Sequence, residues 1–164
     1  MRKSLIVTAA VLLGLIAAPC MAKDYIVIDF KEDNTDVLVL DPSTITPVHD
    51  NIIAAWDIVF LQGPGVDTDG VVRKRTNFWY DCATPRSAIQ AMEVYDSPTG
   101  PALDAWDHPE DELQWDPIDD GTISAYERNI VCGTETATED GILTADSDED
   151  LQRKLADYYT STQK

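Results

Sequence analysis

The sequence is short of positive charge, of cysteine and, after its first residues, of long hydrophobic runs. Its 164 residues include 12 Lys and Arg against 30 Asp and Glu, giving a formal net charge of −18 at pH 7. Nucleic acids and anionic membrane surfaces are bound by Lys and Arg that neutralise phosphate, so both are excluded as partners. A partner should be basic or neutral, although the charge is more simply explained by solubility.

One long uncharged run lies at the N-terminus, directly after Arg2 and Lys3. It is shorter than the ~20 apolar residues that span a bilayer, and it ends on the small residues of a cleavage site. We therefore predict a secretory signal peptide over residues 1–22 and a periplasmic or secreted protein with no membrane span. A lipid anchor on Cys20 at the outer surface is less favoured, because Pro19 stands where a small residue is usual.

Only three cysteines are present, and the first, Cys20, lies in the predicted leader. The remaining pair, Cys82 and Cys132, should be oxidised to a disulfide in an exported protein. In the chain-entropy model a bridge over this loop stabilises the fold by about 4 kcal/mol. The spacing excludes a Cys-x-x-Cys redox centre, and with two histidines there is no zinc-ligand pattern, so we expect neither a metal nor a cofactor.

Short β-like runs dominate the first half of the chain after the leader. Gly63-Pro64-Gly65 ends the longest run, which should be the central strand, and the alternating run that follows should be the return arm of a hairpin. Asp41-Pro42-Ser43 predicts a turn that closes the second run. Trp56 and Trp79 should lie in the core or on a sheet face. The predicted strands are Tyr25–Phe30, Asp36–Leu40, Asn51–Leu61, Val71–Cys82 and Ser87–Tyr95. The last could be a helix by propensity, but its position between Cys82 and Ser97-Pro98-Thr99-Gly100 favours a strand.

Residues 102–120 read as an acidic loop with eight Asp and Glu, no Lys or Arg, and two embedded tryptophans. Exposed aromatic side chains can anchor a protein partner, while surrounding carboxylates steer a basic one. The candidate partner-binding residues are Trp106, Trp115, Asp107, Glu110 and Asp111. Packing against the sheet is the alternative for the tryptophans; it is favoured for Trp115 and balanced for Trp106.

A helix should begin at Gly121-Thr122 and carry Cys132 on its last turn, with Gly133 just past its end. The bridge would then clamp this helix to the strand that ends at Cys82. Residues 23–133 are predicted to form one domain, and residues 134–164 an acidic C-terminal tail. Within that tail Ser147 can cap a short helix bearing Leu151 and Leu155, for which a frayed terminal helix is favoured over a partner-binding one.

Taken in order, these segments resemble the surface-adhesin protein E-like domain family of exported bacterial proteins. The resemblance rests on Asp41-Pro42-Ser43-Thr44-Ile45, Trp56, Asn77-Phe78-Trp79-Tyr80-Asp81-Cys82, Trp115-Asp116-Pro117-Ile118 and Asn129-Ile130-Val131-Cys132. It implies an α+β fold in which a helix packs on one face of an antiparallel sheet. It also implies adhesin-like binding to host matrix proteins such as vitronectin and laminin. The acidity of the chain and its leader depart from a surface-exposed adhesin, and no binding residue is carried over.

Signatures of catalysis are missing from the sequence. There is no Gly-x-Ser-x-Gly, and neither His49 nor His108 has a local setting that marks a general base. Asp67-x-Asp69-Gly70 matches only a fragment of a calcium loop, so a solvated turn explains it better. We therefore expect a non-enzymatic envelope protein with a protein partner, and as the alternative a periplasmic inhibitor of a basic enzyme such as a lysozyme.

Overall fold

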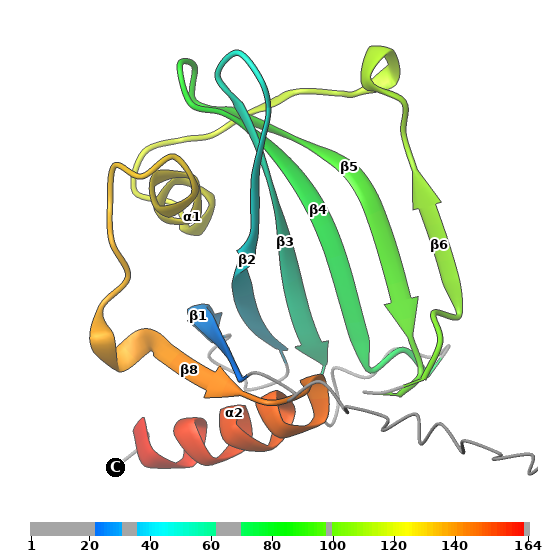
Figure 1. The fold of residues 1–164 in the computed structure, drawn as a ribbon, viewed down its shortest axis with the longest axis vertical. Coiled ribbons are helices and arrows are strands. Elements are labelled where there is room, and N and C mark those ends of the chain that lie inside the picture. The colour runs from blue at the N-terminus through cyan, green and yellow to red at the C-terminus, as the bar shows by residue number, and fades with distance from the viewer. Residues whose placement is uncertain (1–21, 31–35, 62–69, 98–99, 163–164) are drawn as a thin grey trace, which may run out of the picture.

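The computed structural model of the chain describes residues 22–30, 36–61, 70–97 and 100–162. Within them, eight strands form one sheet in the order β6-β5-β4-β3-β2-β1-β8, with β7 beside β5 (Figure 1). The predicted signal peptide, apart from Ala22, and the Gly63-Pro64-Gly65 turn lie outside the described residues. The strands are β1 Lys23–Phe30, β2 Asp36–His49, β3 Ile52–Leu61, β4 Arg73–Asp81, β5 Arg86–Tyr95, β6 Asp104–Asp107, β7 Asp116–Pro117 and β8 Ile142–Ala145. The helices are α1 Ile123–Val131 and α2 Asp148–Thr162, with single 3-10 turns at Glu110–Glu112 and Glu139–Gly141.

The interior strand β3 explains the architecture, because both of its faces are buried. It pairs antiparallel with β2 on one side and with β4 on the other, which confirms the predicted central strand and hairpin. Successive side chains of a strand point to opposite faces. Ala55 and Asp57 therefore lie on one face and Ile58 and Phe60 on the other, and all four are at most 2% exposed.

Each face of the sheet carries its own core, closed by its own helix. On one face Leu40, Ala55 and Tyr80 pack with Val131 of α1. On the other face the core includes two leucines of α2, and both helices lie toward the β1 and β8 end of the sheet (Figure 1). Its members are Tyr25, Val37, Val39, Ile58, Phe60, Ala145, Leu151 and Leu155. The predicted antiparallel sheet with a helix on one face is confirmed, and α2 adds a second helix on the opposite face.

The C-terminal segment, residues 134–162, contains a strand and the helix α2. Strand β8 pairs antiparallel with β1, and Leu151 and Leu155 are fully buried. The predicted cap is present, since the backbone N–H of Asp150 donates to Ser147 Oγ at 3.1 Å. The expectation of a frayed terminal helix is wrong, because two leucines one turn apart suffice to dock α2 on a core that the sheet supplies.

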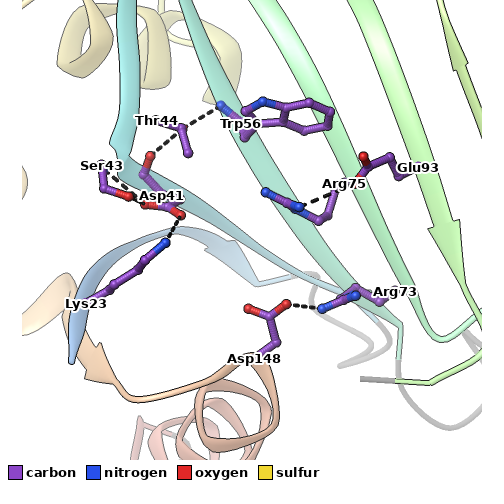
Figure 2. Close-up of polar contacts among 9 residues, drawn as sticks. All are labelled: Lys23, Asp41, Ser43, Thr44, Trp56, Arg73, Arg75, Glu93 and Asp148. Carbon is purple, nitrogen blue, oxygen red and sulfur yellow. Dashed lines mark hydrogen bonds and ion pairs between the residues drawn. The ribbon is translucent and has the colours of Figure 1, made fainter. Parts of the chain in front are cut away.

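Strand β2 continues past the turn predicted at Asp41-Pro42-Ser43. The segment instead forms a bulge, since Asp41 pairs with Trp56 and the next paired residue, Thr46, faces Ala54. Pro42 has no backbone N–H for the ladder. Side chains replace the lost pairing: Thr44 Oγ1 donates to Asp41 O at 2.6 Å and accepts the N–H of Trp56 at 2.9 Å (Figure 2). The Asp41-Pro42-Ser43 sequence, which is typical of a turn, therefore forms a bulge within β2.

The disulfide joins Cys82 and Cys132, as predicted, with their Cα atoms 5.6 Å apart. Thr122 caps the start of α1 by accepting the N–H of Ala125 at 3.2 Å, and Cys132 caps its end. Arg128 of α1 adds hydrogen bonds to the backbone carbonyls of Asp81 and Cys82, at 3.0 and 2.9 Å. The end of α1 is thus attached to the end of β4 by one covalent bond and two hydrogen bonds.

Candidate partner-binding surface

The open end of the sheet is formed by β6, which is paired with β5 only. Its register places Trp106 opposite Met92, Ala105 opposite Glu93 and Asp107 opposite Ala91. All four residues of β6 are exposed, in contrast to the buried strands at the centre. The segment predicted as an irregular acidic loop therefore adds β6, a 3-10 turn and β7 to the edge of the sheet. A terminal strand leaves backbone groups and side chains available to a partner.

Trp106 is 39% exposed and lies between two grooves, both of which it lines. The first groove has a volume of about 270 Å³ and is lined by Ile89, Trp106, His108, Glu112, Gln114 and Asp116. The second has a volume of about 220 Å³ and is lined by Trp56, Ala91, Glu93, Ala105, Trp106 and Asp107. We call the second one the Trp56–Trp106 groove. Aromatic and acidic side chains dominate both.

The predicted binding residues fall into separate groups in the structure. Trp106 and Asp107 share the Trp56–Trp106 groove, whereas Glu110 and Asp111 lie on an exposed 3-10 turn. Glu110 Oε1 is 2.7 Å from His49 Nε2. Trp115 is half-buried on its own, with the Arg86 guanidinium 4.8 Å from its ring centroid. Trp106 and Asp107 are neighbours on β6, so their side chains point to opposite faces of the sheet. A role in partner binding stays a prediction for all five residues.

Arginines on the sheet repeat one arrangement, in which the guanidinium covers an aromatic ring and bonds a carboxylate. Arg73 lies 3.8 Å from the ring centroid of Tyr95 and bonds Asp148 of α2 (Figure 2). Arg75 lies 4.9 Å from the ring centroid of Trp56 and bonds Glu93 at 3.3 Å. Cation–π attraction and a charge-assisted hydrogen bond act together in this arrangement.

Arg86 makes the third example, since it covers Trp115 and its Nε donates to Asp81 Oδ2 at 2.9 Å. Three arginines of the sheet are therefore each held by one aromatic ring and one nearby carboxylate. The sequence offered a partial signal, because Arg73 and Arg75 fall on one side of the alternating run. Their partners could not be read from the sequence, since cross-strand register decides which ring and which acid meet each arginine.

Two tyrosines of the sheet, Tyr25 and Tyr95, have raised pKa values and remain protonated. Burial and then the negative charges of Asp148 and Asp41 raise the pKa of Tyr25 to about 12. Burial, and next the hydrogen bond to Glu93, raise the pKa of Tyr95. Both phenols stay neutral at physiological pH, and the Tyr95 hydroxyl donates to Glu93 Oε2 at 2.5 Å.

A second polar group lies beneath α1, where Asp57 of β3 meets Glu127 of the helix. Both are at most 3% exposed, and Asp57 Oδ1 and Glu127 Oε1 have no hydrogen-bond partner. Burial raises the pKa of both carboxyls, and for Asp57 the charge of Glu127 and a hydrogen bond to it raise the pKa further. Tyr80 also hydrogen-bonds Glu127. This enclosed pair is out of reach of a substrate, so we assign it to the packing of α1.

The described ranges hold neither a metal-binding cluster nor a membrane-spanning helix. No group of three or more His, Cys, Asp or Glu is arranged there to hold a metal ion. None of the helices in the same ranges combines the length and the apolar character needed to cross a bilayer.

Comparison with known proteins gives one family match. The family described as surface-adhesin protein E matches residues 27–133. Protein E of Haemophilus influenzae in crystal form II is 16% identical, with a TM-score of 0.47 over 67% of this chain and 87% of that one. Protein E from non-typeable Haemophilus influenzae is 18% identical, with a TM-score of 0.48 over 66% and 75%. No curated protein sequence matches the chain.

Proposed function

Because the chain belongs to the surface-adhesin protein E family, we propose that it is an exported, non-enzymatic envelope protein that binds a protein partner as an adhesin does. The family match, which extends from β1 to the end of α1, supports an adhesin-like role. The hydrophobic leader supports export to the periplasm or beyond the cell. The disulfide agrees with an oxidising compartment.

The observation that carries the binding role is the exposed edge at β6. Trp106 stands there on a strand whose residues are all exposed, between two grooves and among acidic side chains. Aromatic residues on a rigid scaffold supply much of the energy of protein interfaces. We propose Trp106 as the main anchor, with Asp107, Glu110 and Asp111 steering the partner. Trp115, beneath Arg86, would contribute less.

The test is a binding assay with purified protein and a defined panel. The panel contains vitronectin, laminin and outer-membrane fractions, and surface plasmon resonance compares wild type with Trp106→Ala. We expect saturable binding to at least one component and about a tenfold loss in the variant, as for an interface hot spot. Gln152→Ala, on the opposite end of the molecule, is the control. Binding that is unchanged by Trp106→Ala would contradict the assigned surface, and binding to none of the panel would contradict adhesion.

A second function is favoured by the charge of the β6 edge. Residues 102–120 carry eight acidic side chains and no basic one, which suits inhibition of a basic periplasmic enzyme such as a lysozyme. The test is lysozyme activity at 10 to 300 mM salt with the protein in excess. Inhibition that disappears with salt would support this function, and full activity at the lowest salt would remove it.

A further inference from the structure

The open edge of the sheet has a gap between the places where β6 and β7 pair with β5. Residues 91–94 of β5 pair with β6 and residues 86–87 pair with β7, so in the described chain residues 88–90 have no strand beside them on this edge. The chain leaves β5 after His108 and returns to it at Asp116 (Figure 1). The groove of about 270 Å³ lies at this gap, because residues of β5 and of both sides of the loop line it. We call it the Ile89–Trp106 groove.

The strand register places the two ends and the floor of this groove on one face of the sheet. Through β5, Trp106, Ile89 and Asp116 are aligned with three alternating residues of β4. These are Thr76, Phe78 and Tyr80, respectively. Alternate residues of a strand point to one face, and Tyr80 belongs to the core that α1 closes. Trp106, Ile89 and Asp116 therefore share the α1 face, beyond the strands β1, β2 and β3 that α1 contacts.

The groove combines aromatic rings, an apolar floor and a row of oxygen acceptors. Trp106 and His108 lie two residues apart, with their ring centroids separated by 4.9 Å. Ile89 forms the floor and is 36% exposed. The acceptors alternate along the segment that returns to β5, and all are exposed: Glu112, Gln114 and Asp116. The groove thus offers apolar surface at one end and negatively charged acceptors at the other.

The acceptors of the returning segment have no donor in the part of the chain that the structure describes. There, no hydrogen bond or ion pair involves the side chains of Glu112, Gln114 or Asp116. Residues 102–120 contain no Lys or Arg. Arg86 of β5 precedes the residue opposite Asp116, so its side chain points to the other face of the sheet. A donor for this groove must therefore come from another molecule.

We propose that the Ile89–Trp106 groove binds an arginine side chain of the protein partner, with its aliphatic stem on Ile89 and Trp106 and its guanidinium among the acceptors of the returning segment. Arginine joins an apolar stem to five donors in one plane, which suits a groove with apolar surface and several acceptors. Lysine would present its donors from a single point, and an anion would be repelled by Glu112 and Asp116. This inference rests on the proposed binding function and names the chemistry of its partner.

The experiment titrates the full mature protein with a blocked pentapeptide that carries one arginine in a Gly and Ser background. Binding is followed by NMR of ¹⁵N-labelled protein at low and physiological salt, with the indole N–H of Trp106 assigned through Trp106→Phe. We expect shifts at that indole and at the amides of Ile89 and Asp116. Peptides with citrulline or norleucine in place of arginine lack the charge and should bind about threefold or more weakly. A lysine peptide should bind more weakly than the arginine peptide.

Two double variants that remove the same charge separate the groove from general attraction. Glu112→Gln/Asp116→Asn should weaken binding of the arginine peptide about threefold or more. Asp104→Asn/Asp120→Asn removes two exposed acids of the same acidic segment outside the groove and should change binding little. Circular dichroism and thermal unfolding check that both variants fold. Equal losses in the two variants, equal binding of the citrulline, norleucine or lysine peptide, shifts centred elsewhere, or no binding at all would overturn the inference.

Failure of the inference can be told apart from failure of the proposed function. If Trp106→Ala abolishes binding of a protein partner while arginine and citrulline peptides bind alike, the chemistry assigned to the groove is wrong and the binding function stands. If the arginine peptide occupies the groove but no protein of the panel binds, the arginine site stands and the adhesin function fails.

Discussion

The two ends of the sheet are built in opposite ways. At one end β1 and β8 lie between two helices, and the cores on the two faces are closed by α1 and α2 (Figure 1). At the other end β6 is a short strand with every residue exposed. At this covered end, α1 ends at Cys132 of the disulfide and carries Glu127 of the buried carboxyl pair, and α2 carries the two buried leucines. With the proposed binding surface at β6, this difference predicts that stability and partner binding are separated along the sheet, so that each can be changed with little effect on the other.

The largest effect is expected from removing the disulfide. The double variant Cys82→Ser/Cys132→Ser should lose about 4 kcal/mol of unfolding free energy, because the bridge limits the unfolded chain over a separation of 50 residues. Urea denaturation of oxidised wild type, reduced wild type and the double variant measures the loss. The reduced wild type should resemble the variant. Equal midpoints for all three would show that Arg128 and the helix core hold α1 without the bridge.

Leu151→Ala should give the next largest effect, about 2 to 5 kcal/mol, since it opens a cavity in the core beneath α2. The matched control is Leu103→Ala, because Leu103 is 52% exposed and precedes β6. We expect the control to change stability by less than about 0.5 kcal/mol. Similar losses at both leucines would break the contrast between the covered and open ends. The measurement is urea denaturation monitored by tryptophan fluorescence.

Asp57→Asn should change how stability depends on pH. The folded protein raises the pKa of Asp57 above its unfolded value, so the stability this group contributes is present at acidic pH and is lost as pH rises through the folded pKa. Asparagine cannot ionise and can still donate a hydrogen bond to Glu127.

Unfolding free energies between pH 4 and pH 9 should therefore fall less steeply in Asp57→Asn than in wild type. The variant should be more stable by on the order of 1 kcal/mol at the alkaline limit. The exposed Asp104→Asn is the control and should follow the wild-type curve. A variant curve parallel to that of wild type would show that the buried pair does not set the pH dependence at the covered end.

Trp106→Ala should have the smallest effect on stability, less than about 0.5 kcal/mol, although it removes the largest side chain of β6. The same variant is expected to lose partner binding, so the two measurements together sharpen the contrast between the ends. A loss above 2 kcal/mol in thermal unfolding would mean that Trp106 packs as a core residue. That result would return Trp106 to the packing alternative considered from the sequence.

Much of the sheet could be predicted from the sequence, because periodicity and breakers are local signals. The alternating run before Cys82 became β4, and Thr122 and Gly133 marked the limits of α1. The disulfide followed from compartment and count. The docking of α2 could not be predicted, because its narrow stripe of leucines is too short to indicate a buried helix by itself. The leucines have a core to pack against only once β8 pairs with β1.

The candidate site was predicted less completely. Trp106 and Asp107 were found from composition, and the structure places them in one groove. Trp56 and Glu93 were missed as parts of it, because they come from β3 and β5 and meet β6 only through cross-strand register. Composition can identify an exposed aromatic residue among acids. It cannot identify which distant strands form the walls beside it.

The bulge after Asp41 limits which insertions and deletions β2 can accept. Leu40 and Ile45 both belong to the core beneath α1, although residues five apart in an unbroken strand point to opposite faces. The bulge restores their common side by adding an odd number of positions to β2 relative to β3. Insertions or deletions of two residues between Leu40 and Thr46 would preserve this parity, whereas a change of one would turn Ile45 away from its core. The lengths of this segment in related chains can be compared with that expectation.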